Sequence, residues 1–362
     1  MRLLTWWRAL PGGVRRGVGL SWKALATGAA FYLLLNHRLE LNGERVSLWQ
    51  AAVRDLAAIE PVRLVPYLLL AAAIKFVGIF AAMLRWHLLL IGQRIRFDLR
   101  HVVGSFLIGR FLGTFLPSTV GLDAYKLYDA ARFSGCTVEP AAATVVEKVM
   151  GISGIFLCFL VALPLGASVL GPAAPLVALV TVPLAFGVIG ALFLFVLRPS
   201  AVAMFVRLLP TFARRRVGAF VERVSVAMAA YRERRRLLVA VLGLSFAVHF
   251  CTAVLYFFTA LAVGATTARF FEVTLASTIQ IFATVMSPLT IAGEGVREIV
   301  QALLLAKRIG ASQSVLSAAL GFWAAEALTL TGAVFWWLRR EGYRPRVIEL
   351  GPAAPALVSP SA

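Results

Sequence analysis

The stretch "FLPSTVGLD", residues 115–123, breaks an apolar segment where a membrane helix would otherwise continue. Non-helical backbone at membrane depth is tolerated only where it is buried in protein or lines a wet cavity, because unsatisfied amides in hydrocarbon are costly. Pro117 ends a helix, Gly121 allows a close backbone approach, and Ser118 can hydrogen-bond freed backbone groups. The break therefore predicts a polar vestibule inside the membrane.

The composition places the whole chain in a bilayer. Hydrophobic residues make up 60% of the 362 residues, and the mean hydropathy is +0.85, far above a soluble domain with about 45–50% apolar residues. The net charge of +19 comes from arginines that fall between apolar runs, which indicates membrane topology rather than nucleic-acid binding. Three cysteines without metal or disulfide spacing, and no nucleotide-binding or metalloprotease motif, predict neither a metal site nor a cofactor.

Hydrophobic runs and loop charges predict the topology. Runs of about 20 residues can cross the hydrocarbon core, and six are present, at 18–36, 64–91, 140–164, 174–197, 237–263 and 313–338. The shorter runs 101–117 and 272–291 must dip into the membrane and return if the arginine-rich loops are to lie in the cytoplasm. The sequence therefore predicts an all-α polytopic membrane protein with about six transmembrane helices, two re-entrant hairpins and both termini inside.

One transmembrane domain is expected over residues 1–340. It contains a first hairpin at about 101–135, a second at about 272–306, and a cytoplasmic segment at 198–236 that reads as an amphipathic helix on the anionic leaflet. Residues 341–362 are expected to form a flexible tail.

The two breaks resemble each other. Aligning Pro117 with Pro288 also aligns three further pairs at equal offsets, Phe111 with Phe282, Asp123 with Glu294 and Lys126 with Arg297. Because three predicted spans separate the copies, the hairpins should open to opposite faces. This predicts an inverted-topology repeat, which in transporters places a substrate site at mid-membrane.

Ionisable residues inside membrane segments are a functional hypothesis by default. Cations recur beside both breaks, and an anionic head group such as a phosphate would need them. The alternative is that acids and bases pair to hold the bundle together; Lys75 is expected to pair with Glu326, and His249 to be a satisfied hydrogen-bonding residue. Arg85 and Trp86 are expected to lie at the inner interface.

Fourteen residues are the predicted head-group site, with no catalytic group and no metal ligand among them. They are Arg110, Pro117, Ser118, Gly121, Asp123, Lys126, Glu147, Lys148, Pro288, Gly293, Glu294, Arg297, Glu298 and Glu326. In this hypothesis the cations neutralise a phosphate and the carboxylates position them, with Glu147 or Glu326 carrying a coupling proton.

Two signatures resemble the lysylphosphatidylglycerol synthase transmembrane-domain family, which is flippase-like. The first is "LPSTVGLDAYKLYDAARFSGCTVEPAAATVVEKVMG", from Leu116 to Gly151, and the second is the Gly-x-Gly-x-Arg-Glu core that begins at Gly293. Leu122, Lys126 and Lys148 depart from the family pattern, and a lysine loses the bidentate geometry of an arginine. Because residues 1–362 hold no stretch expected to form the aminoacyltransferase domain of fused members, the resemblance implies the translocation half of their activity.

Together these observations predict a non-enzymatic lipid translocase of the bacterial inner membrane, moving a phospholipid or other phosphate-bearing amphiphile between leaflets. Membrane lipids are the expected partners and nucleic acid is not; a homo-oligomer or an envelope-biosynthesis partner remains open. One alternative is an intramembrane transferase acting on a polyprenyl-phosphate or phospholipid, with Asp123 or Glu294 as general base. The other is a non-transporting scaffold for envelope enzymes.

Overall fold

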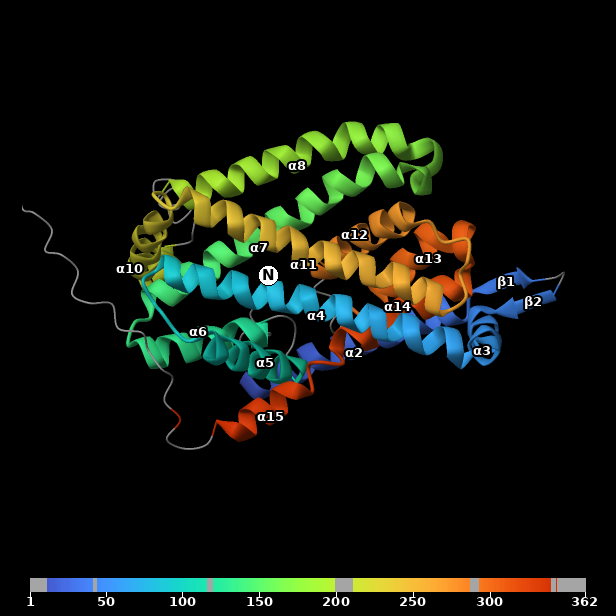
Figure 1. Ribbon diagram of the computed structural model, residues 1–362, viewed down its shortest axis with the longest axis horizontal. Helices are drawn as coiled ribbons and strands as arrows, with labels where there is room; N and C mark the ends of the chain where they lie inside the picture. The colour runs from blue at the N-terminus through green and yellow to red at the C-terminus, as the bar shows by residue number, and fades with distance from the viewer. Residues whose placement is uncertain are drawn as a thin grey trace, which may run out of the picture.

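Long α-helices run side by side along the long axis of the molecule (Figure 1). This computed structural model describes residues 12–41, 44–115, 120–198, 211–286, 293–339 and 343. The only strands in those ranges are β1 (Arg38–Leu41) and β2 (Glu44–Ser47), which pair as an antiparallel hairpin at one end of the bundle. The predicted all-α membrane fold is confirmed. We refer to the two ends of the molecule as the β-hairpin end and the α10 end, after the elements found there (Figure 1).

Four apolar stretches are long enough to cross a membrane. They are α4 (Pro61–Gly92), Val138–Leu197, α11 (Arg235–Ala262) and Ala311–Leu338. The second of these has 60 residues and contains α7 (Val138–Gly166), the 3₁₀ helix η1 (Ala167–Ala173) and α8 (Ala174–Leu197). These stretches hold five of the six predicted spans. The first predicted span is helical, as α2 (Gly12–Leu35), but its apolar part is only Ala24–Leu35, which is shorter than a full crossing requires.

The sixth predicted span is not one uninterrupted α-helix. It divides into α14 (Ala311–Glu326) and α15 (Thr331–Leu338). Between them the amides of Thr329 and Thr331 bond the carbonyls three residues earlier, at 2.9 and 3.1 Å. Such a 3₁₀ stretch inside a helix marks strain or a hinge, and it lies directly after Glu326.

Two helical hairpins enter the bundle from opposite ends (Figure 1). α4 runs antiparallel to α11, since Arg63 lies near Gly264 at the β-hairpin end and Gly92 lies against Tyr231 at the α10 end. The pair α5 (Leu99–Phe115) and α6 (Val120–Ser134) follows the α10 end of α4, whereas α12 (Phe270–Met286) and α13 (Val296–Ile309) follow the β-hairpin end of α11.

The first helix of each hairpin is about half as long as α4. α5 and α12 have 17 residues each, about 25 Å, against 32 residues in α4, about 48 Å. Phe282 near the end of α12 packs against Phe156 of α7, with ring centroids 5.5 Å apart. In the first hairpin, Gly109 and Gly113 of α5 let the backbone of Leu122 approach, because a Cβ at either position would lie 3.1–3.3 Å from a Leu122 backbone atom. Both predicted hairpins are therefore present as helix pairs, at bounds within three residues of those expected.

Polar contacts stabilise each hairpin at its base, the end where the chain enters and leaves it. In the first, Arg339 binds Asp129 of α6 (Nη1 to Oδ1, 2.9 Å) and the carbonyl of His101 of α5 (2.5 Å). The ring of Tyr343 stacks on His101 at 5.9 Å between centroids, so this part of the predicted tail packs on the domain. In the second, Arg308 of α13 lies 3.6 Å from the carboxylate of Glu272 of α12. Sequence reasoning singled out none of these residues.

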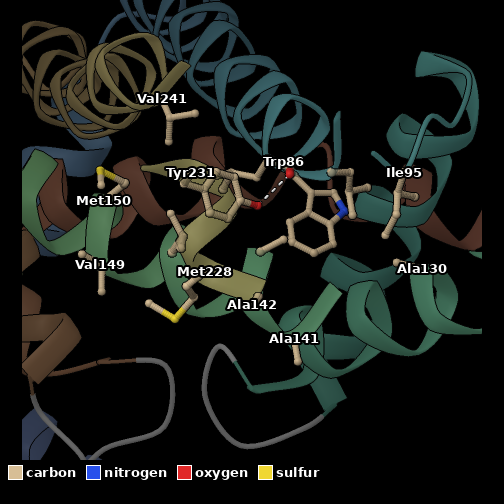
Figure 2. Close-up of a cluster of buried hydrophobic side chains, with 14 of the residues drawn as sticks. Trp86, Ile95, Ala130, Ala141, Ala142, Val149, Met150, Met228, Tyr231 and Val241 are labelled. Atoms are coloured by element: carbon tan, nitrogen blue, oxygen red, sulfur yellow. Dashed lines mark hydrogen bonds between the residues drawn. The ribbon is translucent and has the colours of Figure 1, made fainter. Parts of the chain in front are cut away.

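A large apolar core lies toward the α10 end, where α4, α7 and α11 meet the helix α10 (Thr211–Met228) and the short η2 (Ala229–Tyr231). Figure 2 shows Trp86, Met150 and Tyr231 in this core, with the Tyr231 hydroxyl donating to the Leu89 carbonyl at 2.7 Å. Trp86 is 1% exposed, so its predicted place at the lipid interface is wrong. α10 confirms a helix inside the predicted 198–236 segment, of which residues 199–210 lie outside the described part.

Close packing of α7 on α12 predicts that Gly166→Ala destabilises the protein. An added Cβ would lie 2.4 Å from the backbone oxygen of Phe271, so the helices must separate, at a cost of about 1–3 kcal/mol. We expect a thermal midpoint several degrees below wild type in detergent. Gly190→Ala in α8, where a Cβ meets nothing within 4 Å, is the matched control and should leave the midpoint unchanged or higher; equal midpoints for both variants would contradict the packing.

Candidate functional site

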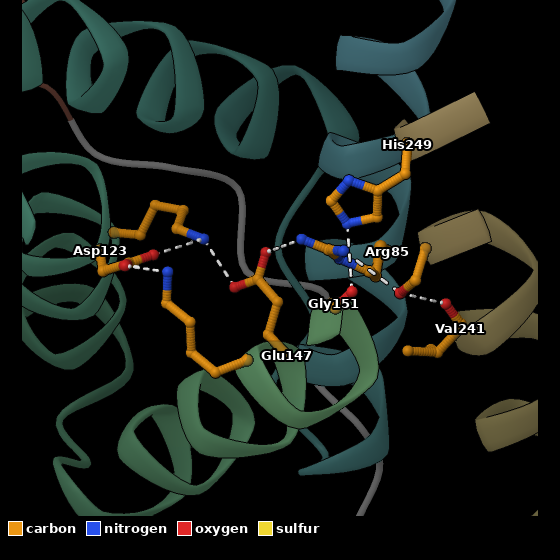
Figure 3. Close-up of polar contacts among 9 residues, drawn as sticks. Arg85, Asp123, Glu147, Gly151, Val241 and His249 are labelled. Carbon is orange, nitrogen blue, oxygen red and sulfur yellow. Dashed lines mark hydrogen bonds and ion pairs between the residues drawn. The ribbon is translucent and has the colours of Figure 1, made fainter. Parts of the chain in front are cut away.

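A buried carboxylate, Glu147 of α7, is held between two cations from other helices (Figure 3). Its Oε1 lies 3.0 Å from Nη2 of Arg85 in α4, and its Oε2 lies 2.6 Å from Nζ of Lys126 in α6. Glu147 is 3% exposed and Lys126 is 1% exposed. Two ion pairs in a low-dielectric interior thus join the first hairpin to the spans on either side of it.

Asp123 extends this group toward the surface. Its Oδ1 lies 3.5 Å from Lys126 Nζ and its Oδ2 lies 2.5 Å from Lys148 Nζ. The Lys148 side chain is 50% exposed, whereas that of Asp123 is 17% exposed. We call Arg85, Asp123, Lys126, Glu147 and Lys148 the first ion cluster; it carries three cations against two carboxylates, so it is net positive.

Arg85 belongs to this cluster and not to the lipid interface, so its predicted snorkelling position is wrong. Its side chain is 12% exposed, and its Nη1 donates to Ser245 Oγ at 3.2 Å. Spacing along α4 could not reveal this, because the partner, Glu147, lies 62 residues away in sequence. His249 behaves as expected: its Nε2 lies 3.1 Å from the carbonyl oxygen of Gly151.

A second pair lies at the distortion between α14 and α15. Arg110 of α5 places Nη2 3.0 Å from each carboxylate oxygen of Glu326 and 3.1 Å from Thr329 Oγ1. The Glu326 side chain is 36% exposed, against 16% for Arg110. Lys75 instead donates to Thr252 Oγ1 at 2.9 Å, so the predicted Lys75–Glu326 pair is wrong, and Glu326 is paired with the first hairpin.

The second hairpin carries a guanidinium at its tip. Arg297, in the first turn of α13, is 4% exposed, and its Nε lies 3.1 Å from Glu298 Oε1. The other oxygen of Glu298 accepts the backbone N–H of Gly295 at 2.8 Å. The guanidinium lies over the ring of Phe322, 4.3 Å from its centroid, a cation–π contact. We call Arg297 and Glu298 the second ion cluster.

Glycines shape this second tip, as the sequence predicts for the breaks. Gly293 and Gly295 have φ of 74° and 82°, a region that favours glycine. A Cβ at Gly293 would lie 2.0 Å from Thr284 Cγ2, and one at Gly295 would lie 2.8 Å from Ala30 Cβ of α2. The chain can turn this tightly only without side chains at these positions.

The structure reproduces only part of the predicted similarity between the breaks. Asp123 makes two ion pairs, whereas its aligned counterpart Glu294 is half-buried and has no cation within ion-pair distance in the described ranges. Gly121 is buried at the start of α6. Pro117, Ser118 and Pro288 lie outside the described residues.

Lys126 and Arg297 occupy matching places. Adding the 171 residues that separate Pro117 from Pro288 to the bounds of α5 gives 270–286, the bounds of α12. Both cations lie on the second helix of their hairpin, both are buried, and both lie on aromatic rings; for Lys126 these are Trp86 at 4.7 Å and Phe106 at 5.3 Å.

The arrangement can bind an anion through desolvated donors. Charge-assisted hydrogen bonds from lysine and guanidinium are strong in such surroundings. No group of three or more His, Cys, Asp or Glu residues that could hold a metal ion occurs in the described ranges. A surface hollow between α7 and α10, lined by Glu139, Glu222 and Arg223, lies apart from both ion clusters; we place the candidate site at the clusters because that is where buried charges converge.

The first ion cluster predicts a large loss of stability for Glu147→Gln. The change leaves Arg85 without a carboxylate partner and Lys126 with only the longer contact to Asp123 at 3.5 Å, and breaking a buried ion pair in this way costs about 3–5 kcal/mol. Lys148→Gln removes a half-exposed ion pair and should cost about 0–1 kcal/mol. Thermal unfolding in detergent measures both, and a Glu147→Gln protein as stable as Lys148→Gln would show that the cluster does not hold the hairpin.

Comparison with known proteins identifies a family for this chain. Residues 24–334 match the family described as lysylphosphatidylglycerol synthase TM region. No curated protein and no solved structure gives a significant match. Because the match covers α2 to α15 and both ion clusters, this chain belongs to the lysylphosphatidylglycerol synthase transmembrane-region family.

Proposed function

We propose that this membrane protein translocates a phospholipid, or another phosphate-bearing amphiphile, between the leaflets of a bacterial inner membrane without chemically altering it. The observation that carries the proposal is the pair of buried cations, Lys126 and Arg297, at matching positions in hairpins that enter from opposite ends. A phosphate has to lose its hydration to cross, and fixed donors at two depths replace that hydration.

The contacts between helices support an inverted repeat. α5 packs on α15, which continues α14, and α12 packs on α7. α4 contacts α7 as α11 contacts α14, and α4 contacts α14 as α11 contacts α7. The helices α4 to α7 form one unit and α11 to α14 form the other, and exchanging the two units preserves these contacts. In this proposal each hairpin is re-entrant, and each ion cluster is reached from a different face of the membrane.

The loop charges support an orientation with the α10 end in the cytoplasm. Arg96, Arg100 and Arg132 lie at this end together with the arginines near η2, whereas the β-hairpin end mixes both signs, with Glu40, Glu44 and Arg45. The positive-inside rule then assigns the first hairpin to the cytoplasmic face and the second to the outer face.

The structure favours Glu326 over Glu147 as the proton-coupling acid. Glu147 is buried between two cations, so releasing it would dismantle the first ion cluster. Glu326 is partly exposed, has Arg110 as its single ion-pair partner in the described residues, and borders the helix distortion. Protonation of Glu326 would therefore remove the charge that pairs with Arg110 and affect the distorted stretch between α14 and α15.

Translocation accounts for the carboxylates better than a transferase does. Of the two candidate general bases, Asp123 is bound to two lysines, which supports a structural role. Glu294 is half-buried with no cation at ion-pair distance in the described ranges, so the test below has to decide its case. A scaffold would not need buried cations at both tips. The test below separates these alternatives, because neither predicts lipid movement.

Neutralising either matched cation should slow lipid exchange. In liposomes with acyl-chain-labelled fluorescent phospholipids, we expect Lys126→Gln and Arg297→Gln to lower the exchange rate about 10- to 100-fold, the effect of one charged hydrogen bond worth about 1.5–3 kcal/mol. Lys126→Gln leaves Glu147 paired with Arg85, so the variant should still fold. Chemical quenching of outer-leaflet fluorescence gives the rate.

Exposed cations on the same helices provide matched controls. Arg132→Gln in α6 and Lys307→Gln in α13 remove a charge from the surface and should retain the wild-type rate. A folded wild-type protein that moves no phosphate-bearing probe, with or without a pH gradient, would contradict the proposal. So would site variants as fast as their controls.

Glu326→Gln tests the coupling role separately. If Glu326 carries the proton, the variant should lose lipid accumulation driven by a pH gradient and keep exchange without a gradient. The same liposomes, with and without an imposed gradient, measure both. Gradient-driven accumulation at the wild-type level would exclude Glu326 as the coupling acid.

A further inference from the structure

The second hairpin contains two buried glutamines whose side-chain oxygens have no hydrogen-bond partner in the described part of the chain. Gln280 of α12 is 2% exposed and Gln301 of α13 is 0% exposed. Their amide nitrogens are used: Nε2 of Gln280 donates to Thr284 Oγ1 and Nε2 of Gln301 donates to Ser277 Oγ, both at 3.1 Å. Both Oε1 atoms are buried and unpaired. In the orientation that makes these bonds, each amide nitrogen is used and each amide oxygen lacks a donor.

Such atoms are uncommon in proteins. Nearly all buried polar groups find a partner, and each exception calls for an explanation such as a water or a ligand. Here two occur on the facing helices of one hairpin, both as acceptors. The two amide oxygens could therefore both accept hydrogen bonds from one bound group.

The two amides lie next to the second ion cluster. Gln301 follows Arg297 by four residues on α13, so the two side chains lie on the same face one turn apart. On α12, Gln280 is three residues after Ser277, the partner of Gln301. Tyr256 of α11 lies beside both Gln280 and Arg297. A head group bound through its phosphate at Arg297 would thus have acceptors within reach of its remaining atoms.

The packing of a hairpin does not require these amides. Subtracting the same 171-residue offset places Gln280 over Gly109 and Gln301 over Ala130 in the first hairpin. Ala130 belongs to the apolar core at 2% exposure, and Gly109 lies against Leu122. The first hairpin therefore closes with apolar atoms where the second keeps two unpaired acceptors.

The charges show the same asymmetry. The first ion cluster has three cations against two carboxylates. Among the described residues of the second tip, Arg297 is the one cation, Glu298 is its partner, and the half-buried Glu294 adds a further carboxylate. One site is rich in donors and the other is rich in acceptors.

We propose that Gln280 and Gln301 form a specificity subsite, beside Arg297, for a hydrogen-bond-donating group attached to the lipid phosphate. An ammonium group and a hydroxyl group share this chemistry. The inference rests on the proposed function and narrows its substrate class to phospholipids whose head group extends beyond the phosphate with a donor. A fully ionised phosphate monoester, which has no hydrogen to donate, would leave both amide oxygens unpaired.

Three lipids with identical labelled acyl chains test the subsite: phosphatidic acid, phosphatidylethanolamine and phosphatidylglycerol. We expect the wild type to move one or both of the last two at least about tenfold faster than phosphatidic acid, since a site built to bond a donor discriminates against an analogue without it. An advantage for phosphatidylethanolamine identifies the donor as ammonium, and one for phosphatidylglycerol identifies it as hydroxyl. Gln280→Leu and Gln301→Leu should reduce the preference over phosphatidic acid to about threefold or less.

Gln313→Leu, a partly exposed glutamine of α14, is the matched control and should keep the preference. The proposal is overturned if the wild type moves all three lipids equally, or if both variants retain the full preference. Should Gln301→Leu fail to fold, Gln301→Met and Gln280→Leu carry the same test.

A binding measurement separates this inference from the proposed function. Short-chain phosphatidylethanolamine or phosphatidylglycerol should raise the thermal midpoint of the purified protein more than short-chain phosphatidic acid does, and the difference should vanish in Gln280→Leu. If no lipid crosses the bilayer but this difference is found, translocation fails and the subsite stands. If the lipids cross and the difference is absent, translocation stands and the subsite fails.

Discussion

The ion pairs of Glu147 with Arg85 and Lys126 are the constraint on which the first half of the bundle depends. A carboxylate 3% exposed among apolar helices requires compensation, and the compensation comes from α4 and α6 at 3.0 and 2.6 Å. Helix α6 carries alternating charges and little apolar surface, so it would be a poor membrane helix alone. Pairing Lys126 with Glu147 lets α6 lie inside the bundle.

In the second hairpin the buried charge is also compensated, but the partner lies in the same helix. Its guanidinium is balanced within its own helix by Glu298 and lies on Phe322. Its turn depends on Gly293 and Gly295 at positive φ. Because Glu298 already neutralises Arg297, the neighbouring side chains do not have to supply a counter-charge. Two of them, Gln280 and Gln301, have amide oxygens without a hydrogen-bond partner in the described residues. Similar scaffolds at the two tips thus present different polar groups.

Sequence reasoning found what is local in the chain. Apolar length predicted the long helices, the proline and glycine breaks marked both hairpins, and the three spans between the breaks predicted their opposite entry. It failed where the deciding contact is distant: Arg85 was expected at the interface because Glu147 is 62 residues away, and Lys75 was given the partner that belongs to Arg110. The distortion after Glu326 contains no proline, and its glycine, Gly332, lies at the start of α15, so the sequence did not mark a break there. Nor could composition reveal the clusters at the hairpin bases, because His101, Asp129 and Arg339 look like ordinary loop and surface residues until α15 brings the last of them back to α5.

The opposite entry of the two hairpins is the central claim, and cysteine accessibility tests it most directly. On a background without Cys158 and Cys251, the native Cys136 and Arg96→Cys flank the first hairpin, while Arg269→Cys and Lys307→Cys flank the second; all four positions are exposed. A membrane-impermeant thiol reagent is applied separately to each face of sealed vesicles of known orientation. The account predicts that residues 96 and 136 react from one face and residues 269 and 307 from the other. Labelling of 96 and 136 from opposite faces, or of all four from one face, would contradict it.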